Sequence, residues 1–212
     1  GTVRFAEGAL ATRTGNVVLL ADLLDTSVAK TAALIEANNP DMDRKLAASI
    51  AERIGLGAVR YAYLRNSRER DIVFSWEEML DFEGDTAPYL LYTVTRCASL
   101  ERKAPAGMMD RVRQVSDEDL ARLDGDHEQE VIKEIDRFAK AVEAARQACE
   151  PSIMIRQVMA LARAFNTFYH HTAVLKAGDE SLTAARLALA GAVGRTLIAG
   201  LRLAGIEPVD RM

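Results

Sequence analysis

Hydrophobic residues recur at helical spacing throughout the second half of the chain. Apolar positions three and four residues apart predict helices over residues 86–103, 117–123, 126–149, 151–171 and 179–205. A stretch with proline and glycine predicts a linker over 104–116. Pro151 and Asp179 stand where helices favour their first residues, and Gly205 stands where a helix favours its end. This pattern predicts an all-α bundle.

The first half alternates short extended runs with helical ones. Apolar runs at 3–5 and 71–74 predict strands, and helices are expected over residues 22–38, 42–53, 56–65 and 76–80. Gly55 is expected to end the second of these helices. The expected buried stripe of the first helix consists of Leu23, Leu24, Val28, Ala32 and Ile35. The fold is therefore expected to be mainly α, with a small mixed α/β unit at 1–85 before a helical bundle at 86–212.

Composition is that of an ordinary globular protein. Hydrophobic residues make up 49% of the 212 residues and charged residues 27%. The net charge of −4 does not by itself indicate a nucleic-acid binder, although a local basic patch can act within an acidic chain. No signal peptide is found, and arginines interrupt the most apolar stretch at 182–205. We expect a cytoplasmic protein with no membrane partner.

The sequence shows no pattern of residues typical of a metal site or of acid–base catalysis. Cys97 and Cys149 lack metal-ligand spacing and are expected to be small buried side chains, so no metal site is predicted. The acidic residues of the second half are expected to be solvated: Asp117, Glu118, Asp119, Glu128, Glu130, Glu134 and Asp136. Three glycines in the last helix, at positions 191, 194 and 200, indicate close helix packing.

An aromatic and basic stripe is expected on the helix at 86–103. At 100° per residue, Tyr89, Tyr92 and Arg96 fall on the side opposite Leu91 and Val94. Tyrosine and arginine side chains can stack on unpaired bases and hydrogen-bond to them, as in the recognition of single-stranded RNA. Alternatively, the tyrosines close the rim of the core with their hydroxyl groups in water.

The helix at 151–171 carries a similar polar stripe. Its expected buried stripe consists of Val158, Leu161, Phe165 and Phe168, with Tyr169 at the edge. The opposite stripe consists of Arg156, Arg163, Asn166 and His170. This stripe can hold phosphates and bases, or it can be a solvated helix face.

Several strings carry a resemblance to a known family. Residues 71–76 (DIVFSW) and 82–92 (FEGDTAPYLLY) resemble the junction between the catalytic and anticodon-binding domains of arginyl-tRNA synthetases, although Leu91 stands where glutamine is usual. Residues 185–189 (ARLAL) and 200–212 (GLRLAGIEPVDRM) resemble the C-terminal helix and terminus of the same family. The resemblance runs in order along the whole chain. It implies a C-terminal part of a class I synthetase with a DALR anticodon-binding domain.

A catalytic loop is implied near the start of the chain. Residues 11–16 (ATRTGN) resemble a degenerate KMSKS loop that has lost its lysines, so Arg13 and Thr14 are the implied catalytic residues on the ATP side. The HIGH motif and the ATP-binding half would precede residue 1. The chain alone is therefore expected to be inactive and to hold no cofactor. ATP with Mg²⁺, and arginine, would be substrates of the full-length ligase.

The resemblance also implies which residues meet RNA. Positions near the anticodon loop are Tyr89, Tyr92, Arg96, Asn166, Tyr169 and Met212, and the polar stripe at 151–171 adds Arg163 and His170 as candidate tRNA-binding residues. The expected partners are tRNA(Arg) and the catalytic half of the parent chain, and DNA is not expected. The alternative function is that of a free-standing, non-catalytic tRNA-binding module or synthetase paralogue.

Overall fold

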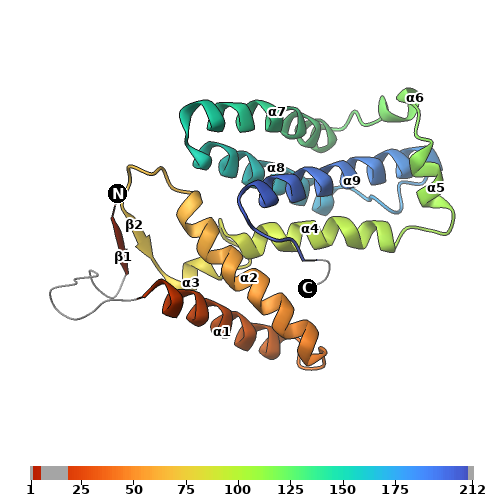
Figure 1. Cartoon of the computed structure of the whole chain (residues 1–212). Coiled ribbons are helices and arrows are strands. Elements are labelled where there is room, and N and C mark those ends of the chain that lie inside the picture. Colours follow the sequence, from red (N-terminus) through yellow and green to blue (C-terminus); the bar gives the residue numbers. More distant parts are fainter. Residues whose placement is uncertain (1, 6–18, 210–212) are drawn as a thin grey trace.

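The computed structural model describes residues 2–5 and 19–209. A small unit at one end holds two strands and three helices, and a larger bundle holds the others (Figure 1). The elements of the small unit are β1 (Val3–Phe5), α1 (Leu20–Asn38), α2 (Arg44–Leu64), β2 (Ile72–Phe74) and α3 (Trp76–Met79). The bundle consists of α4 (Ala87–Arg102), α5 (Met108–Arg113), α6 (Asp117–Leu120), α7 (Asp126–Ala148), α8 (Pro151–His171) and α9 (Glu180–Leu203). The predicted fold class is confirmed.

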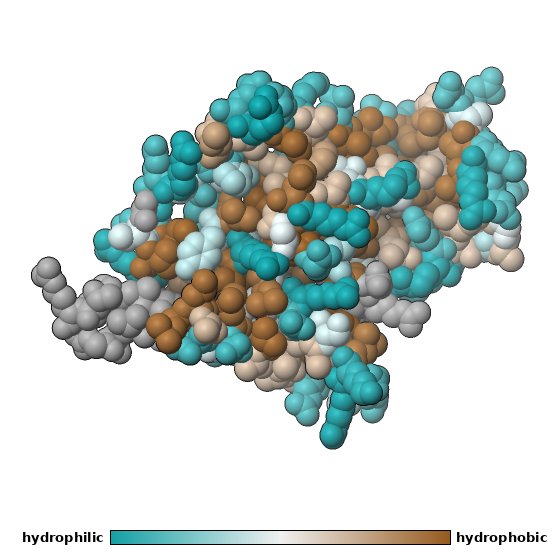
Figure 2. Space-filling view, viewed as in Figure 1, coloured by the Kyte–Doolittle hydropathy of each residue, from teal (hydrophilic) through white to brown (hydrophobic). Residues whose placement is uncertain are grey.

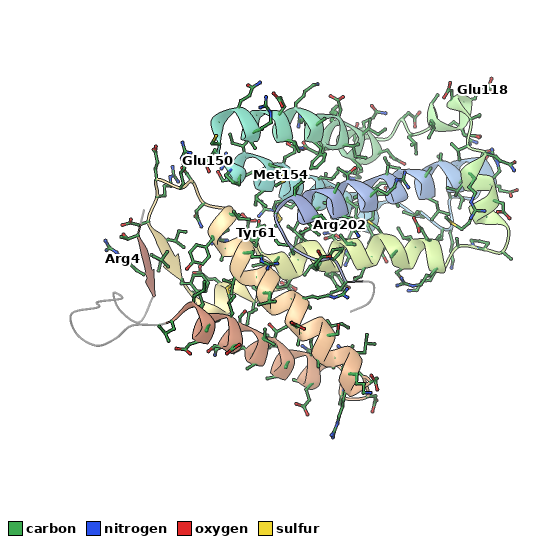
Figure 3. All side chains as sticks on the ribbon, viewed as in Figure 1. Arg4, Tyr61, Glu118, Glu150, Met154 and Arg202 are labelled. Carbon is green, nitrogen blue, oxygen red and sulfur yellow. The ribbon has the colours of Figure 1, made fainter. Side chains whose placement is uncertain are left out.

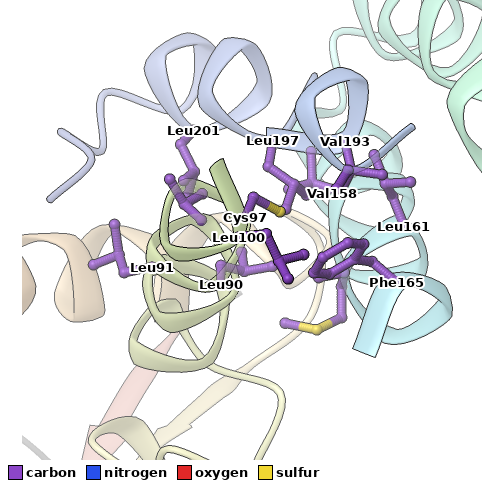
Figure 4. Packing of buried hydrophobic residues seen from close by; sticks show 14 of the residues in the cluster. Leu90, Leu91, Cys97, Leu100, Val158, Leu161, Phe165, Val193, Leu197 and Leu201 are labelled. Carbon is purple, nitrogen blue, oxygen red and sulfur yellow. The ribbon is translucent and has the colours of Figure 1, made fainter. Parts of the chain in front are cut away.

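The core of the bundle lies between α4, α8 and α9 (Figure 4). Fully or nearly fully buried side chains from these three helices meet there: Leu90, Leu91, Cys97, Val158, Leu161, Phe165, Val193, Leu197 and Leu201. Each buried leucine or phenylalanine stabilises the fold by about 1.5–3 kcal/mol relative to an exposed one. The predicted buried stripe of α8 is confirmed, since its four residues are all fully buried.

The ends of the long helices follow the signals in the sequence. The Thr86 side chain accepts a hydrogen bond from the backbone N–H of Tyr89, and Asp179 accepts one from Leu182. Gly205 follows α9 with a φ of 70°, the left-handed conformation that glycine favours after a helix. The expected linker at 104–116 is wrong in part, because it contains α5. The Met108 side chain is buried, and this packing holds the short helix in place.

The expected break at Gly55 is wrong, because α2 runs through it without interruption. A side chain at this position would place its Cβ 2.8 Å from Val28 Cα on α1. Glycine therefore permits the two helices to approach closely, and Ser27 Oγ donates a hydrogen bond to the Gly55 carbonyl at 2.8 Å. The predicted buried stripe of α1 also needs correction, because α1 packs against α2 through the side that carries Ser27. Ser27 and Thr31 are buried there, whereas Ala32 is exposed.

Two expectations about polar side chains are also wrong. Three of the acidic residues expected in solvent, Asp119, Glu128 and Glu134, are buried, and each is paired with an arginine. Cys149 is exposed, because it ends α7 with a φ of 49° and lies outside the core. Cys97 is buried as expected, and its burial raises the pKa of the thiol to about 12.

Helix α9 covers the stretch at 182–205 that arginines were expected to interrupt. By length and composition it is apolar enough to cross a membrane, yet 61% of the apolar window is buried inside the structure. Its leucines and glycines pack against α4 and α8, so α9 is the central helix of the bundle. The predicted close packing is confirmed at Gly194 and Gly200, since a Cβ at Gly194 would lie 3.2 Å from Cys97 Cβ, but not at Gly191, where a Cβ would meet only the ends of two flexible side chains.

The small unit has its own core. Strands β1 and β2 pair in parallel, with Val3 opposite Ile72, and Phe74, Val59 and Leu23 are buried beneath them. Hydrophobic side chains gather on the surface at this end of the molecule (Figure 2), where Leu19, Leu20 and Val73 are about three-fifths exposed.

Candidate nucleic-acid interface

The side chain of Arg96 is held between two tyrosines. Its guanidinium carbon lies 4.8 Å from the centre of the Tyr92 ring, on the same helix, and 4.6 Å from that of Tyr169 on α8. Arginine planes and aromatic rings attract each other in this geometry. The helical stripes predicted separately on residues 86–103 and 151–171 therefore meet in one stack of three side chains.

A hydrogen-bonded chain fixes the edge of this stack. Arg96 donates to the side-chain oxygen of Asn166, and the Asn166 amide donates to Thr93 Oγ1 at 2.8 Å. Thr93 in turn donates to the carbonyl of Tyr89 at 2.8 Å. Asn166 was expected on an open polar face, but it is 8% exposed, because α8 packs there against α4. The orientation of the guanidinium is thus set by both helices.

The stack opens on a hollow of about 920 Å³ between α4, α8 and the loop before α4. Its lining residues are Phe82, Glu83, Tyr89, Tyr92, Arg96, Arg163, Asn166, Thr167, His170 and His171. Tyr92 is 42% exposed, so one of the stacking rings faces solvent directly. The volume lies in the range of about 300–1,000 Å³ that is typical of ligand clefts. Flat rings, a guanidinium and amide groups in such a hollow can stack on a base and hydrogen-bond to its edge.

Asp85 joins this hollow to the small unit. Arg163 Nη2 lies 4.0 Å from the Asp85 carboxylate, and the Tyr61 hydroxyl of α2 donates to the same carboxylate. Arg65 Nη1 donates to the Asp85 carbonyl at 2.8 Å. Burial and the Asp85 carboxylate hold the pKa of Tyr61 far above its usual range, so this hydroxyl remains a donor at all physiological pH values.

The two histidines at the end of α8 point to different neighbours, because adjacent residues of a helix do not face each other. His170 packs edge-on against Tyr169, whereas His171 stacks on His127 of α7 with ring centres 5.0 Å apart. Within residues 2–5 and 19–209, no group of three or more potential metal ligands comes together.

Two family models match the chain in succession. The model described as the catalytic domain of class I (R) tRNA synthetases matches residues 5–76, and the one described as the DALR anticodon binding domain matches residues 90–212. The chain belongs to the arginyl-tRNA synthetase family. Apart from Phe82, Glu83 and Tyr89, the residues that line the hollow between α4 and α8 lie in the part of the chain that matches the anticodon-binding domain.

Known synthetases resemble the chain over its whole length. It is 42% identical over 212 residues to the arginine–tRNA ligase of Clostridium perfringens and 42% identical over 214 residues to that of Clostridium acetobutylicum. The chain spans 36% of the length of each of these relatives. Its structure is also similar to that of the Thermus thermophilus arginyl-tRNA synthetase, with a TM-score of 0.83 and 27% identity. The superposition covers the whole of this chain and 34% of the Thermus chain.

The structure brings six of the eight residues predicted to bind tRNA into the lining of one hollow. These are Tyr89, Tyr92, Arg96, Arg163, Asn166 and His170. Tyr169 contacts Arg96 from the other side, and Met212 lies outside the described residues. Arg13 and Thr14 of the KMSKS-like loop also lie outside the described residues.

Sequence reasoning missed several residues of the hollow. Phe82 and Glu83 reach it from the loop before α4, and Thr93 supports Asn166 from inside the bundle. No helical stripe points to the two loop residues, because they precede the helix. Thr93 has a signal of its own, since a threonine in the middle of a helix needs a hydrogen-bond partner.

Proposed function

We propose that this chain binds the anticodon loop of tRNA(Arg) in the hollow between α4 and α8. The observation that carries the proposal is the Tyr92–Arg96–Tyr169 stack, fixed by Asn166 at the mouth of the hollow. An unpaired base stacks on the exposed Tyr92 ring, and the polar groups of the hollow hydrogen-bond to its edge. Arg163 and His170 border the same hollow and supply donors for the RNA.

The binding residues fall within residues 86–212, which we propose as the anticodon-binding domain. Residues 1–85 would then be the end of the catalytic domain, with the KMSKS-like loop and its residues Arg13 and Thr14 on the ATP side. The parent enzyme would join arginine to tRNA(Arg) in the cytoplasm with ATP and Mg²⁺. In this proposal the remaining part of the enzyme activates arginine, and the chain described here holds the anticodon.

Titration of tRNA(Arg) against wild-type chain and two variants tests the site. Tyr169→Ala removes one face of the stack, and Arg96→Ala removes its centre. Each is expected to weaken binding by about 5- to 150-fold, because a base–aromatic stack contributes about 1–3 kcal/mol. Lys133→Ala is the matched control, since Lys133 is exposed on α7, outside the hollow, and should leave the affinity unchanged.

Circular dichroism melts of all four proteins show whether the variants fold. If folded Tyr169→Ala and Arg96→Ala proteins bind like wild type, the site assignment is wrong. If the wild-type chain binds no better than an unrelated acidic helical protein, the proposed function itself fails.

A further inference from the structure

A second hollow of about 460 Å³ continues from the first along α4. Its lining residues are Tyr92, Thr95, Arg96, Ser99, Arg102, Lys103 and Tyr169. Tyr92 and Arg96 line both hollows. The stacked side chains therefore stand between the two, and a chain-like ligand can pass from one hollow to the other across them.

The chemistry of the second hollow differs from that of the first. Three cations, two aliphatic hydroxyl groups and two tyrosines line it, and none of its described lining residues is acidic. The hydroxyl of Thr95 donates its proton to the Tyr92 carbonyl at 2.8 Å, so the Ser99 hydroxyl is the one that can donate to a ligand beside the cations. Arginine, lysine, serine and threonine are the side chains that contact phosphate oxygens in nucleic-acid complexes.

The spacing of these residues follows one side of α4. Arg96, Ser99 and Lys103 are three and four residues apart, so they lie one above the other on the helix. At about 1.5 Å per residue, the line from Arg96 to Lys103 is about 10 Å long. The C-terminal end of a helix carries about half a negative charge, and the full positive charges of Arg102 and Lys103 outweigh it. The cationic side chains thus line this side of the helix over about 10 Å.

We propose that this second hollow, here called the α4 phosphate track, binds the sugar–phosphate backbone of the RNA strand whose bases enter the first hollow. The proposal rests on the function proposed above and extends it from the bases to the strand that carries them. A positive groove beside a stacking platform is the arrangement that holds single-stranded RNA without reading its sequence. The track and the stack therefore contribute affinity, and the hydrogen-bonding groups of the first hollow contribute selectivity.

Salt dependence separates these two contributions. Binding of tRNA(Arg) by wild type, Lys103→Gln and the double variant Arg102→Gln/Lys103→Gln is measured over a series of salt concentrations. Each lost phosphate contact is expected to make the negative slope of log K against log salt shallower by about 0.7–0.9. The ratio of affinities for tRNA(Arg) and for the same tRNA with a changed anticodon should stay that of wild type.

Lys133→Gln is the matched control, because it removes the same charge from the exposed face of α7 and should leave the slope unchanged. If both track variants fold and keep the wild-type slope, the phosphate track is wrong while the anticodon site stands. If they lose anticodon selectivity together with affinity, these residues contact bases and the proposal is also wrong. If the wild-type chain binds no tRNA, both the track and the proposed function fail.

Discussion

At the scale of single residues, the buried ion pair between Arg186 and Glu128 ties α9 to α7. The Arg186 Nη2 and Glu128 Oε1 atoms lie 2.8 Å apart, and the side chains are 18% and 5% exposed. Arg186 also donates to the Ala173 carbonyl at 3.3 Å, in the loop between α8 and α9. Sequence pattern gave no sign of this pair, because the two residues are 58 positions apart.

Replacing Arg186 with methionine should destabilise the bundle strongly. The change leaves the Glu128 carboxylate buried without its partner, which costs about 3–5 kcal/mol. Urea unfolding of the Arg186→Met protein measures this loss. Lys140→Met is the control, because the Lys140–Asp136 pair is about three-quarters exposed and should contribute about 0–1 kcal/mol. Equal losses for the two variants would contradict the structural role of the buried pair.

The candidate site also shows what single positions reveal before a structure exists. The stripe of Tyr89, Tyr92 and Arg96 follows from helical geometry, and the structure brings all three to one hollow. The burial of Asn166 could not be predicted, because it depends on how α8 crosses α4 and on the hydroxyl of Thr93. Helical periodicity gives the face of a residue but not the neighbour that covers it.

At the scale of elements, the start of α9 depends on one carboxylate. Asp179 caps the helix through the N–H of Leu182 at 2.9 Å and pairs with both terminal nitrogens of Arg122. The Arg122 side chain, and then the Leu182 N–H, hold the pKa of Asp179 down at about 2. The Ser116 backbone N–H, and then the Arg111 side chain, likewise hold the pKa of Asp119 well below its usual range.

Acid should therefore weaken the bundle through its helix caps. An unfolded aspartate titrates near 3.8, above the folded value of about 2, so the unfolded chain binds more protons between these pH values. The stability contributed by Asp179 is complete above pH 4 and is lost as the pH falls towards 2. Asp179→Asn keeps a capping oxygen without the charge, so its free energy of unfolding should change less with pH over this interval. Chemical denaturation at a series of acidic pH values measures this, and parallel curves for the two proteins would refute it.

Two glycines of α9 offer a test of close helix packing. A Cβ on Gly200 would collide with Val158 Cγ2 and lie 3.2 Å from Phe138 Cε2, whereas a Cβ on Gly191 would meet only the ends of the Glu101 and Arg195 side chains. Gly200→Ala should thus cost about 1–3 kcal/mol through overpacking. Gly191→Ala should be neutral or stabilise by up to about 1 kcal/mol, because alanine favours the helix. Thermal melts compare the two, and similar melting temperatures would contradict the packing argument.

The long helices were predictable because their capping signals and apolar periods agree. Helix α8 starts and ends at the predicted residues, and α9 begins directly after its predicted cap. The full length of helix α2 was not predictable, because a glycine such as Gly55 is a typical helix-ending signal. In the structure Gly55 instead allows α2 to pack closely against Val28 of α1. The same local signal fits both outcomes, and only the packing of α1 decides between them.

At the scale of the whole molecule, α2 belongs to two cores. Ile54 and Tyr61 pack into the core of the bundle, whereas Ala58 and Val59 pack into that of the small unit. The loop after α2 adds further contacts, since Ser67 donates to Glu150 and Arg68 to the Cys149 carbonyl, each at 3.1 Å (Figure 3 shows Tyr61 and Glu150). The small unit thus contacts α8 in two places. Asp85 lies between Tyr61 of α2 and Arg163 of α8, and the loop after α2 contacts the turn between α7 and α8.

Selectivity for the anticodon tests the proposed function of the whole chain most directly. The 212-residue chain is titrated with tRNA(Arg) and with the same tRNA in which each anticodon base is replaced. We expect the altered tRNA to bind at least about tenfold more weakly at the same salt concentration, because the polar groups of the hollow lose the base edges to which they hydrogen-bond. Equal affinity for the two tRNAs would contradict anticodon recognition in the α4–α8 hollow.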